Sequence, residues 1–284
     1  MPSSSKVEFS VIMSPNIITK KNLILSSSGT DPQEAFDPLT AIVTQPVLYL
    51  DATGLVDGAA NAYGIVDASG NVSQWSDLSS NGWHFTQGTG MNQPLLTVDG
   101  LLFNGISQYL QSTDKTKAKF LHDGTDFTIF FKWKTSDSDP ENIQVLYDDC
   151  DYTASKIGHS TYYNDFSTSE DRLASFIANT TGLPIAGGFG SNGNIPSPDT
   201  TNLINARFDY NGGGGNTYVL RNNGADIWSG AYSGTPSTSN ATYNPTIGRR
   251  ANSADSYLEG YLQKVLFYNV ALSAGDIAIL EANL

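Results

Sequence analysis

Apolar and polar residues alternate along this chain in short runs that turn residues separate. The run "FTIFFKWKT" (127–135) is apolar in its first half and alternates in its second, a pattern that predicts a buried strand. "NLINARFDY", "NTYVLRNNGADIW" and "YLQKVLFYNV" predict further strands. Between "TYVL" and "IWSG", the pair Asn223-Gly224 predicts a two-residue hairpin turn, because both residues tolerate a positive φ.

The one helix that the pattern predicts lies in the C-terminal stretch "LSAGDIAILEANL". Ser273 stands at the N-cap with Asp276 three residues later, and Ile277, Leu280 and Leu284 share one face. Elsewhere strands and turns follow one another with no alternation of strand and helix, and no repeat of 20–50 residues is evident. This order favours an all-β fold, a two-sheet antiparallel sandwich with a short C-terminal helix.

Charge and cysteine content exclude several classes of partner. The 284 residues carry a formal net charge of −13, which repels a phosphate backbone and an anionic membrane surface, so neither nucleic acid nor membrane is expected as a partner. Cys150 is the only cysteine, so no intramolecular disulfide can form. The N-terminal "MPSSSKVEFSVIMSPNIITKK" lacks the apolar core and cleavage site of a signal peptide, and we expect no export by the general secretory route.

Residues 1–46 differ in composition from the rest and are expected to form an extended N-terminal arm, with one domain over 47–284. Alternation of Val7, Phe9 and Val11 gives one apolar strand face, whereas the stretch after it is rich in turn residues and proline. Two interpretations stay open, a disordered leader and an arm for attachment or oligomerisation. On the second, the arm mediates self-association, with a trimer suggested by analogy with phage fibres, or docks on a larger shell.

Both ends of the 47–284 segment carry motifs of a known family. "LYLDA", "VSQWSDLSSNG" and "FNGISQYL" match its opening pattern, and "IGRRANSADSYLEGYLQKVLFYNVALSAGDIAILEANL" matches its closing pattern. The segment resembles the concanavalin A-like, laminin-G-like jelly-roll domains, with a weaker fit around 137–200. The resemblance implies a two-sheet antiparallel jelly roll whose first and last strands lie near each other. Such domains bind sugars, bind proteins or build surface assemblies, and they occur in bacterial surface proteins and phage virions.

The resemblance also assigns roles within "VSQWSDLSSNGWHFTQ". Trp75 is expected to fill the core between the sheets, and Asp77 to accept backbone N–H groups in the turn with help from Ser79. The pair Asn81-Gly82 is expected to supply positive φ angles. Trp83 and His84 are less determined and stay open as exposed residues that contact a ligand.

The stretch "GHSTYYNDF" (158–166) has the chemistry of a sugar platform. Aromatic rings stack on the C–H face of a sugar, and amides and carboxylates bind its hydroxyls. The candidate ligand-binding residues are therefore Tyr162, Tyr163, Asn164 and Asp165. The same composition is also typical of an ordinary sandwich edge.

"YDDCDYT" (147–153) is the densest carboxylate cluster and a candidate Ca²⁺ site. Alternation places Asp149 and Asp151 on one face of a strand with Asp148 opposed, and Ca²⁺ is an ion that related domains often hold. The alternative is a solvated acidic turn. The acidic neighbours are also expected to raise the pKa of Cys150, which argues against a reactive thiolate.

Catalysis is not expected. Glycosidases on this kind of sandwich carry paired acidic residues on one strand face, and none of the six glutamates has another at a spacing of two. The three histidines show no zinc-ligand spacing, and no nucleophile-elbow G-x-S-x-G occurs.

Three functions remain as hypotheses. The first is a non-enzymatic virion-surface protein of a bacteriophage, a fibre or capsid-decoration subunit whose arm binds other virion proteins and whose jelly roll meets host glycans. The second is a carbohydrate-binding, lectin-like module on a bacterial surface or outside the cell. The third is a glycan hydrolase.

Overall fold

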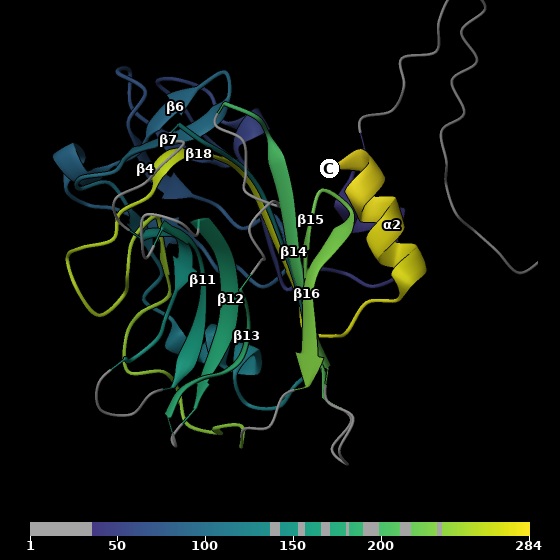
Figure 1. The fold of residues 1–284 in the computed structure, drawn as a ribbon. Coiled ribbons are helices and arrows are strands. Elements are labelled where there is room, and N and C mark those ends of the chain that lie inside the picture. The colour runs from purple at the N-terminus through teal and green to yellow at the C-terminus, as the bar shows by residue number, and fades with distance from the viewer. Residues whose placement is uncertain are drawn as a thin grey trace, which may run out of the picture. The chain divides into compact units, whose positions relative to one another are not determined.

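A computed structural model of the protein describes residues 36–136, 143–152, 157–165, 171–179, 182–189, 199–210, 217–231 and 235–284. Within this part, two antiparallel sheets pack face to face as a sandwich (Figure 1). The predicted all-β, two-sheet architecture is confirmed. The N-terminal residues 1–35, including the predicted strand face at Val7, Phe9 and Val11, lie outside the described residues.

The first sheet has eight strands in its described part. Its order is β16 (Ala225–Ala231), β15 (Thr217–Asn222), β14 (Asn202–Asp209), β9 (Phe127–Thr135), β18 (Glu259–Tyr268), β7 (Gly100–Asn104) and β6 (Leu95–Thr97), and β1 (Leu48–Asp51) also pairs with β18. The predicted strands at 127–135, 202–210, 216–228 and 261–270 all belong to this sheet. It therefore contains the strands that the alternation pattern identified best.

The second sheet has ten strands in its described part. Its order is β13 (Gly182–Phe189), β12 (Asp171–Asn179), β11 (Gly158–Asp165), β10 (Gln144–Asp148), β17 (Thr246–Ile247), β8 (Leu110–Gln111), β5 (Phe85–Thr86), β4 (Val72–Trp75), β3 (Gly64–Val66) and β2 (Ala60–Asn61). Three short 3₁₀ helices lie between strands: η1 (Ala52–Gly54), η2 (Gly90–Asn92) and η3 (Lys115–Leu121). Strands β10 to β13 fall where the family motifs fit least well.

Two local predictions from the sequence are confirmed in atomic detail. The turn between β15 and β16 has φ values of 48° at Asn223 and 79° at Gly224, the left-handed pair that a tight hairpin requires. Helix α2 (Ala274–Asn283) begins after Ser273, whose Oγ accepts the N–H of Asp276 at 3.1 Å. The same hydroxyl donates to the Asp276 carboxylate at 2.7 Å, so cap and acid satisfy each other.

Helix α2 covers part of the outer face of the eight-stranded sheet (Figure 1). Ile277 and Leu280 pack there in one apolar cluster with Phe130 of β9 and Leu266 of β18. This second, smaller core explains why β9 and β18 carry apolar residues on both faces. The same cluster buries the apolar face of the amphipathic helix.

The compact unit begins earlier than the predicted boundary at Val47. It starts at Phe36, and the short helix α1 (Pro38–Ala41) is capped by Asp37, whose carboxylate accepts the N–H of Leu39 at 3.0 Å. Ile42 is buried in the same cluster as α2. Residues 36–46 therefore pack on the domain. Their apolar side chains join the cluster that contains helix α2, which is more than 200 residues away in sequence. In the described part of the chain, no helix is both long and apolar enough to span a bilayer.

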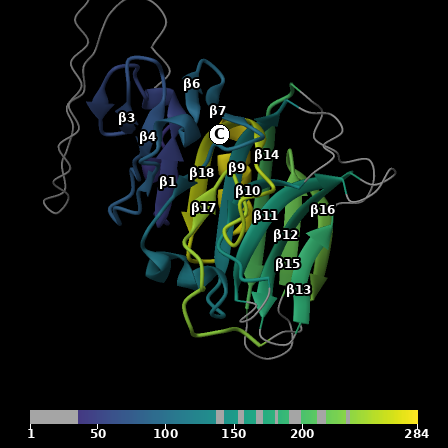
Figure 2. The same ribbon diagram turned by 90° about the vertical axis from the view of Figure 1, so that its left-hand side faces the viewer.

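Two different strands pair with β18 along one of its edges (Figure 2). Strand β9 runs along the whole of its other edge, whereas β7 pairs with residues 259–262 and β1 with residues 264–267. The first and last long strands of the domain thus lie side by side, as the family resemblance implies. The register leaves Gln263 at the point where β7 gives way to β1.

Candidate functional site

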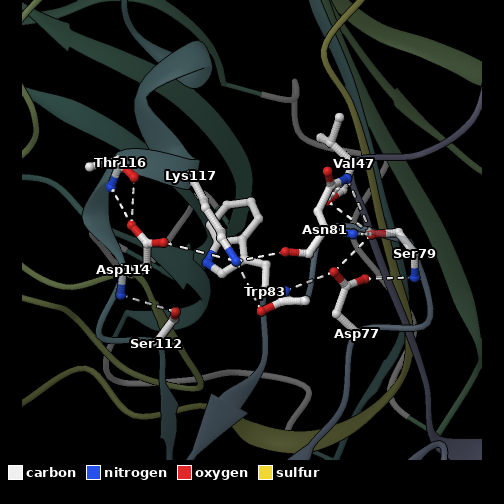
Figure 3. Close-up of polar contacts among 10 residues, drawn as sticks. Val47, Asp77, Ser79, Asn81, Trp83, Ser112, Asp114, Thr116 and Lys117 are labelled. Carbon is white, nitrogen blue, oxygen red and sulfur yellow. Dashed lines mark hydrogen bonds and ion pairs between the residues drawn. The ribbon is translucent and has the colours of Figure 1, made fainter.

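The turn after β4 is held by one buried carboxylate (Figure 3). Asp77 accepts three backbone N–H groups: from Tyr49 at 3.0 Å, from Ser79 at 2.9 Å and from Trp83 at 2.8 Å. The hydroxyl of Ser79 donates to the same carboxylate at 2.8 Å, and its oxygen lies 3.2 Å from the carbonyl oxygen of Val47. Asp77 therefore ties β1 to the turn, which is a structural role.

The neighbouring residues of this turn divide their roles. Trp75 is fully buried in the core between the sheets. Of the pair Asn81-Gly82, only Gly82 has a positive φ, at 61°. Asn81 departs from its predicted role. Its backbone is not left-handed, and its side chain instead donates a hydrogen bond to the carbonyl of Val47 at 3.1 Å.

Trp83 is not available to a ligand, which corrects the interpretation of it as an exposed contact residue. Its ring is 1% exposed and packs among three aromatic rings, those of Phe85, Phe120 and Phe267. The backbone just before it is covered by Lys117, whose ammonium donates to the carbonyls of Asn81 at 2.7 Å and Gly82 at 2.9 Å (Figure 3).

His84 is exposed, but its imidazole faces the same turn. Its Nδ1 accepts the N–H of Asp77 at 3.0 Å, which makes it part of the hydrogen-bond network of the turn. The stretch "VSQWSDLSSNGWHFTQ" as a whole thus joins strands rather than forming an open ligand site.

The predicted sugar platform on β11 is also corrected where the structure describes it. Tyr163 is fully buried and lies against the ring of Trp133, with ring centroids 5.9 Å apart. Tyr162 points to the opposite face of the sheet, where it is 7% exposed beside Phe176. Alternation along a strand separates adjacent rings, so two consecutive tyrosines cannot form one platform. The side chains of Asn164 and Asp165 lie outside the described residues.

The predicted calcium pair does not converge on a common point. Asp149 accepts the N–H of His159 at 2.5 Å, and Asp151 accepts the hydroxyl of Thr242 at 3.2 Å. Burial raises the pKa of Asp149 well above its usual range. Among the described residues no group of three or more acidic, histidine or cysteine side chains could hold a metal. The residues present do not fit a Ca²⁺ site.

Asp148, which pattern analysis placed on the opposite face, has a structural role. Its carboxylate accepts the hydroxyl of Tyr152 at 2.8 Å and the N–H of Ala251 at 2.6 Å, and burial raises its pKa to about 6. Cys150 is buried beside it. Burial, with the charges of Asp148 and Asp149 adding to it, raises the pKa of the Cys150 thiol, so no reactive thiolate forms there.

A chain of buried polar groups crosses the core. His159 Nε2 lies 3.1 Å from the Thr161 hydroxyl, which contacts Ser175 at 2.8 Å, and Ser175 contacts the hydroxyl of Tyr218 at 2.7 Å. Tyr218 belongs to the eight-stranded sheet and the other three to the ten-stranded sheet. Burial lowers the pKa of His159 to about 3, so this histidine is neutral, and the contact between Ser175 and Tyr218 links the two sheets.

A cleft of about 750 Å³ opens where β1 ends and β7 begins along β18. Asp51 of β1 pairs with Lys264 and Leu101 of β7 pairs with Leu262, so Gln263 has no partner opposite it on this side. On the other side, β9 pairs with residues 262 and 264 and skips 263, so Gln263 is the extra residue of a β-bulge. Bulges of this kind redirect a side chain and are frequent next to binding sites.

The walls of the cleft come from segments far apart in sequence. One wall is η1 and the residues after it, with Thr53, Val56 and Asp57, and the other is the turn between β6 and β7, with Val98 and Asp99. The cleft is mixed in character, since carboxylates, an amide and a hydroxyl lie beside valine side chains.

Gly100 allows the second wall to approach β18. Its φ is +114°, and a Cβ at this position would lie 2.7 Å from the carbonyl oxygen of Leu262. Sequence inspection alone did not single out this cleft, because its members belong to three different segments and only the strand order brings them together.

The sequence comparison identifies the family. The laminin-G-type model described as "Concanavalin A-like lectin/glucanases superfamily" matches residues 104–278, more than half of the chain. The protein therefore belongs to this superfamily. A search of the curated proteins found no match.

Solved structures with a similar fold include parts of sialidases. The module named CBM40 of the Ruminococcus gnavus IT-sialidase superposes with a TM-score of 0.49 at 16% identity over 64% of this chain and 96% of that chain. The same module bound to alpha2,3 sialyllactose gives 0.43 at 16% identity over 55% and 82%. A Trypanosoma rangeli sialidase in complex with sialic acid gives 0.49 at 13% identity, over 82% of this chain and 32% of that chain. These values describe a similarity of fold alone.

Proposed function

We propose that residues 36–284 form a carbohydrate-binding, lectin-like module. The observation that carries the proposal is the cleft beside β18, where the side chains of Asp57 and Gln263 have no hydrogen-bonding partner among the described residues. Exposed Val56 and Val98 flank them. A sugar presents hydroxyls and apolar C–H faces together, and a mixed cleft of this kind suits both. Membership of a superfamily of lectins and glucanases supports the same conclusion.

We propose binding without hydrolysis. A glycosidase needs two carboxyl groups that flank the scissile bond, and both must be free to act. In the cleft, Asp99 accepts a hydrogen bond from the ammonium of Lys134 at 3.0 Å, so its carboxylate is already paired with a cation. The two glutamates that the structure describes, Glu259 and Glu281, are absent from the lining of the cleft.

A location for the protein follows from this proposal. A glycan-binding module acts where glycans are displayed, so we propose a bacterial surface or extracellular setting. The virion-surface role rests on the N-terminal arm, whose residues 1–35 lie outside the described residues, and nothing in the sandwich bears on it. Self-association through the arm stays a prediction.

A glycan array tests the proposal directly, with the full chain as analyte and released reducing sugar measured on soluble polysaccharides in parallel. The expected result is binding to a subset of glycans that the free sugar inhibits, without release of reducing ends. Binding to no glycan would refute the carbohydrate role, and catalytic release of reducing ends would favour the glucanase side of the superfamily.

A further inference from the structure

The cleft beside β18 has a defined charge, which restricts the ligands that it can take. Three carboxylates lie in or next to it, those of Asp57, Asp99 and Asp199, and one ammonium, that of Lys134. The formal charge of this group is −2. The whole chain carries a formal net charge of −13, so its net charge does not offset that of the cleft.

The single ammonium is not available to an anionic ligand. Lys134 Nζ lies 3.0 Å from Asp99 Oδ2 and 4.0 Å from Asp199 Oδ1, and it also stands over the ring of Tyr261, 4.6 Å from its centroid. The hydrogen bond to Asp99 is the main reason that the pKa of Lys134 is raised. Its charge is therefore already balanced from three directions.

The groups that are free suit hydroxyls. The amide of Gln263 can donate two hydrogen bonds and accept others, and the carboxylate of Asp57 accepts only. A pair of neighbouring sugar hydroxyls can donate to Asp57 and exchange hydrogen bonds with Gln263. Asp57 is exposed, whereas Gln263 is partly buried at the strand junction. A ligand would therefore contact the two side chains at different depths of the cleft.

Apolar contacts are available at the same place. Val98, at the tip of the β6–β7 turn, is fully exposed, and Val56 is more than half exposed on the opposite wall. Single exposed valines are common on protein surfaces. Two of them on facing walls of a polar cleft give the C–H face of a sugar ring a surface to cover.

We propose that this cleft is the glycan site and that it selects uncharged sugars, with acidic sugars such as sialic acids and uronic acids excluded by Asp57 and Asp99. This inference rests on the proposed carbohydrate function and adds its location and specificity. A carboxylate on the ligand would face the two cleft carboxylates with no free cation among the described residues to meet it, whereas a neutral hexose meets only hydrogen-bonding groups and apolar walls.

The test compares matched pairs of glycans on the full chain. Lactose-terminated and sialyllactose-terminated glycans differ by one acidic sugar, and the array also carries other neutral and uronic-acid glycans. The variants are Asp57→Asn, Gln263→Ala and Asp57→Lys, and the control is Asp255→Asn, an exposed aspartate outside the cleft. Equal melting temperatures show that each variant is folded.

The expected result is binding to neutral glycans that falls by about tenfold or more in Asp57→Asn, since a hydrogen bond that involves a charged group has about that effect. Gln263→Ala removes hydrogen bonds between neutral groups, and binding should fall by about threefold to tenfold. Asp255→Asn binds as the wild type does. Asp57→Lys loses neutral glycans and gains acidic ones.

Two outcomes would overturn the inference while the carbohydrate function stands: preferential binding to sialylated or uronic-acid glycans, and neutral binding that the cleft variants leave unchanged. Binding to no glycan at all would refute the proposed function itself.

Discussion

Replacement of Asp77 by alanine tests how much of the domain depends on one turn. The side chain accepts the N–H groups of Tyr49, Ser79 and Trp83, and the donors of Tyr49 and Trp83 are buried. Each buried donor that loses its partner costs about 1–3 kcal/mol, and the part-exposed Ser79 donor can turn to water. We therefore expect Asp77→Ala to lower the free energy of unfolding by about 2–6 kcal/mol.

A matched control separates burial from hydrogen-bond count. Asp67 accepts the N–H groups of Ser69 and Asn71 at 2.8 and 2.9 Å and the amide of Asn71 at 2.8 Å, in a turn of the same kind. That turn is exposed, so its donors find water when the carboxylate is removed, and Asp67→Ala should change stability far less. Urea denaturation followed by tryptophan fluorescence measures both. Equal losses in the two variants would refute the reasoning.

Two further predictions concern the core and the arm. Protonation of His159, whose pKa burial lowers from 6.5 to about 3, destabilises the fold as the pH falls below 6.5, by up to about 5 kcal/mol at pH 3. Urea denaturation from pH 7 to pH 4 should show a weaker loss of stability in His159→Gln, and parallel curves would contradict this. A chain that begins at Phe36 should keep its melting temperature because α1 and Ile42 are retained, but should be smaller by light scattering. If the full and shortened chains are both monomers, the arm does not mediate self-association.

The sequence predicts the fold best where one physical rule acts alone. Strand β9 and the Asn223-Gly224 hairpin follow from alternation and from turn chemistry, and α2 follows from its cap and apolar face. Alternation does not identify strand β11, because His159 and Thr161 are polar yet fully buried, and Thr161 contacts Ser175 on the neighbouring strand β12. The local sequence pattern does not show which residues on other strands will satisfy a buried polar group.

The candidate site was less accessible to sequence analysis than the fold was. Trp83 and Tyr163 have the composition of a ligand platform, but large rings in a small sandwich are needed first to fill the core. The cleft depends on the bulge at Gln263 and on the order of strands around β18. Asp57 and Val98 approach that bulge only after the chain has folded, so no spacing along the sequence marks them as a set.

The pairing of β1 with β18 constrains when the domain can form during synthesis. Leu48 pairs with Phe267, so a strand made at the start must wait for one made near the end before the central sheet is complete. Contacts this remote in sequence slow folding, because the long intervening loop must close before they contribute. A ribosome-bound chain that lacks β18 would also leave β9 without the neighbour that covers its edge. Folding is therefore expected to wait until β18 has been synthesised, and chains truncated before residue 259 should aggregate rather than form a smaller stable sandwich.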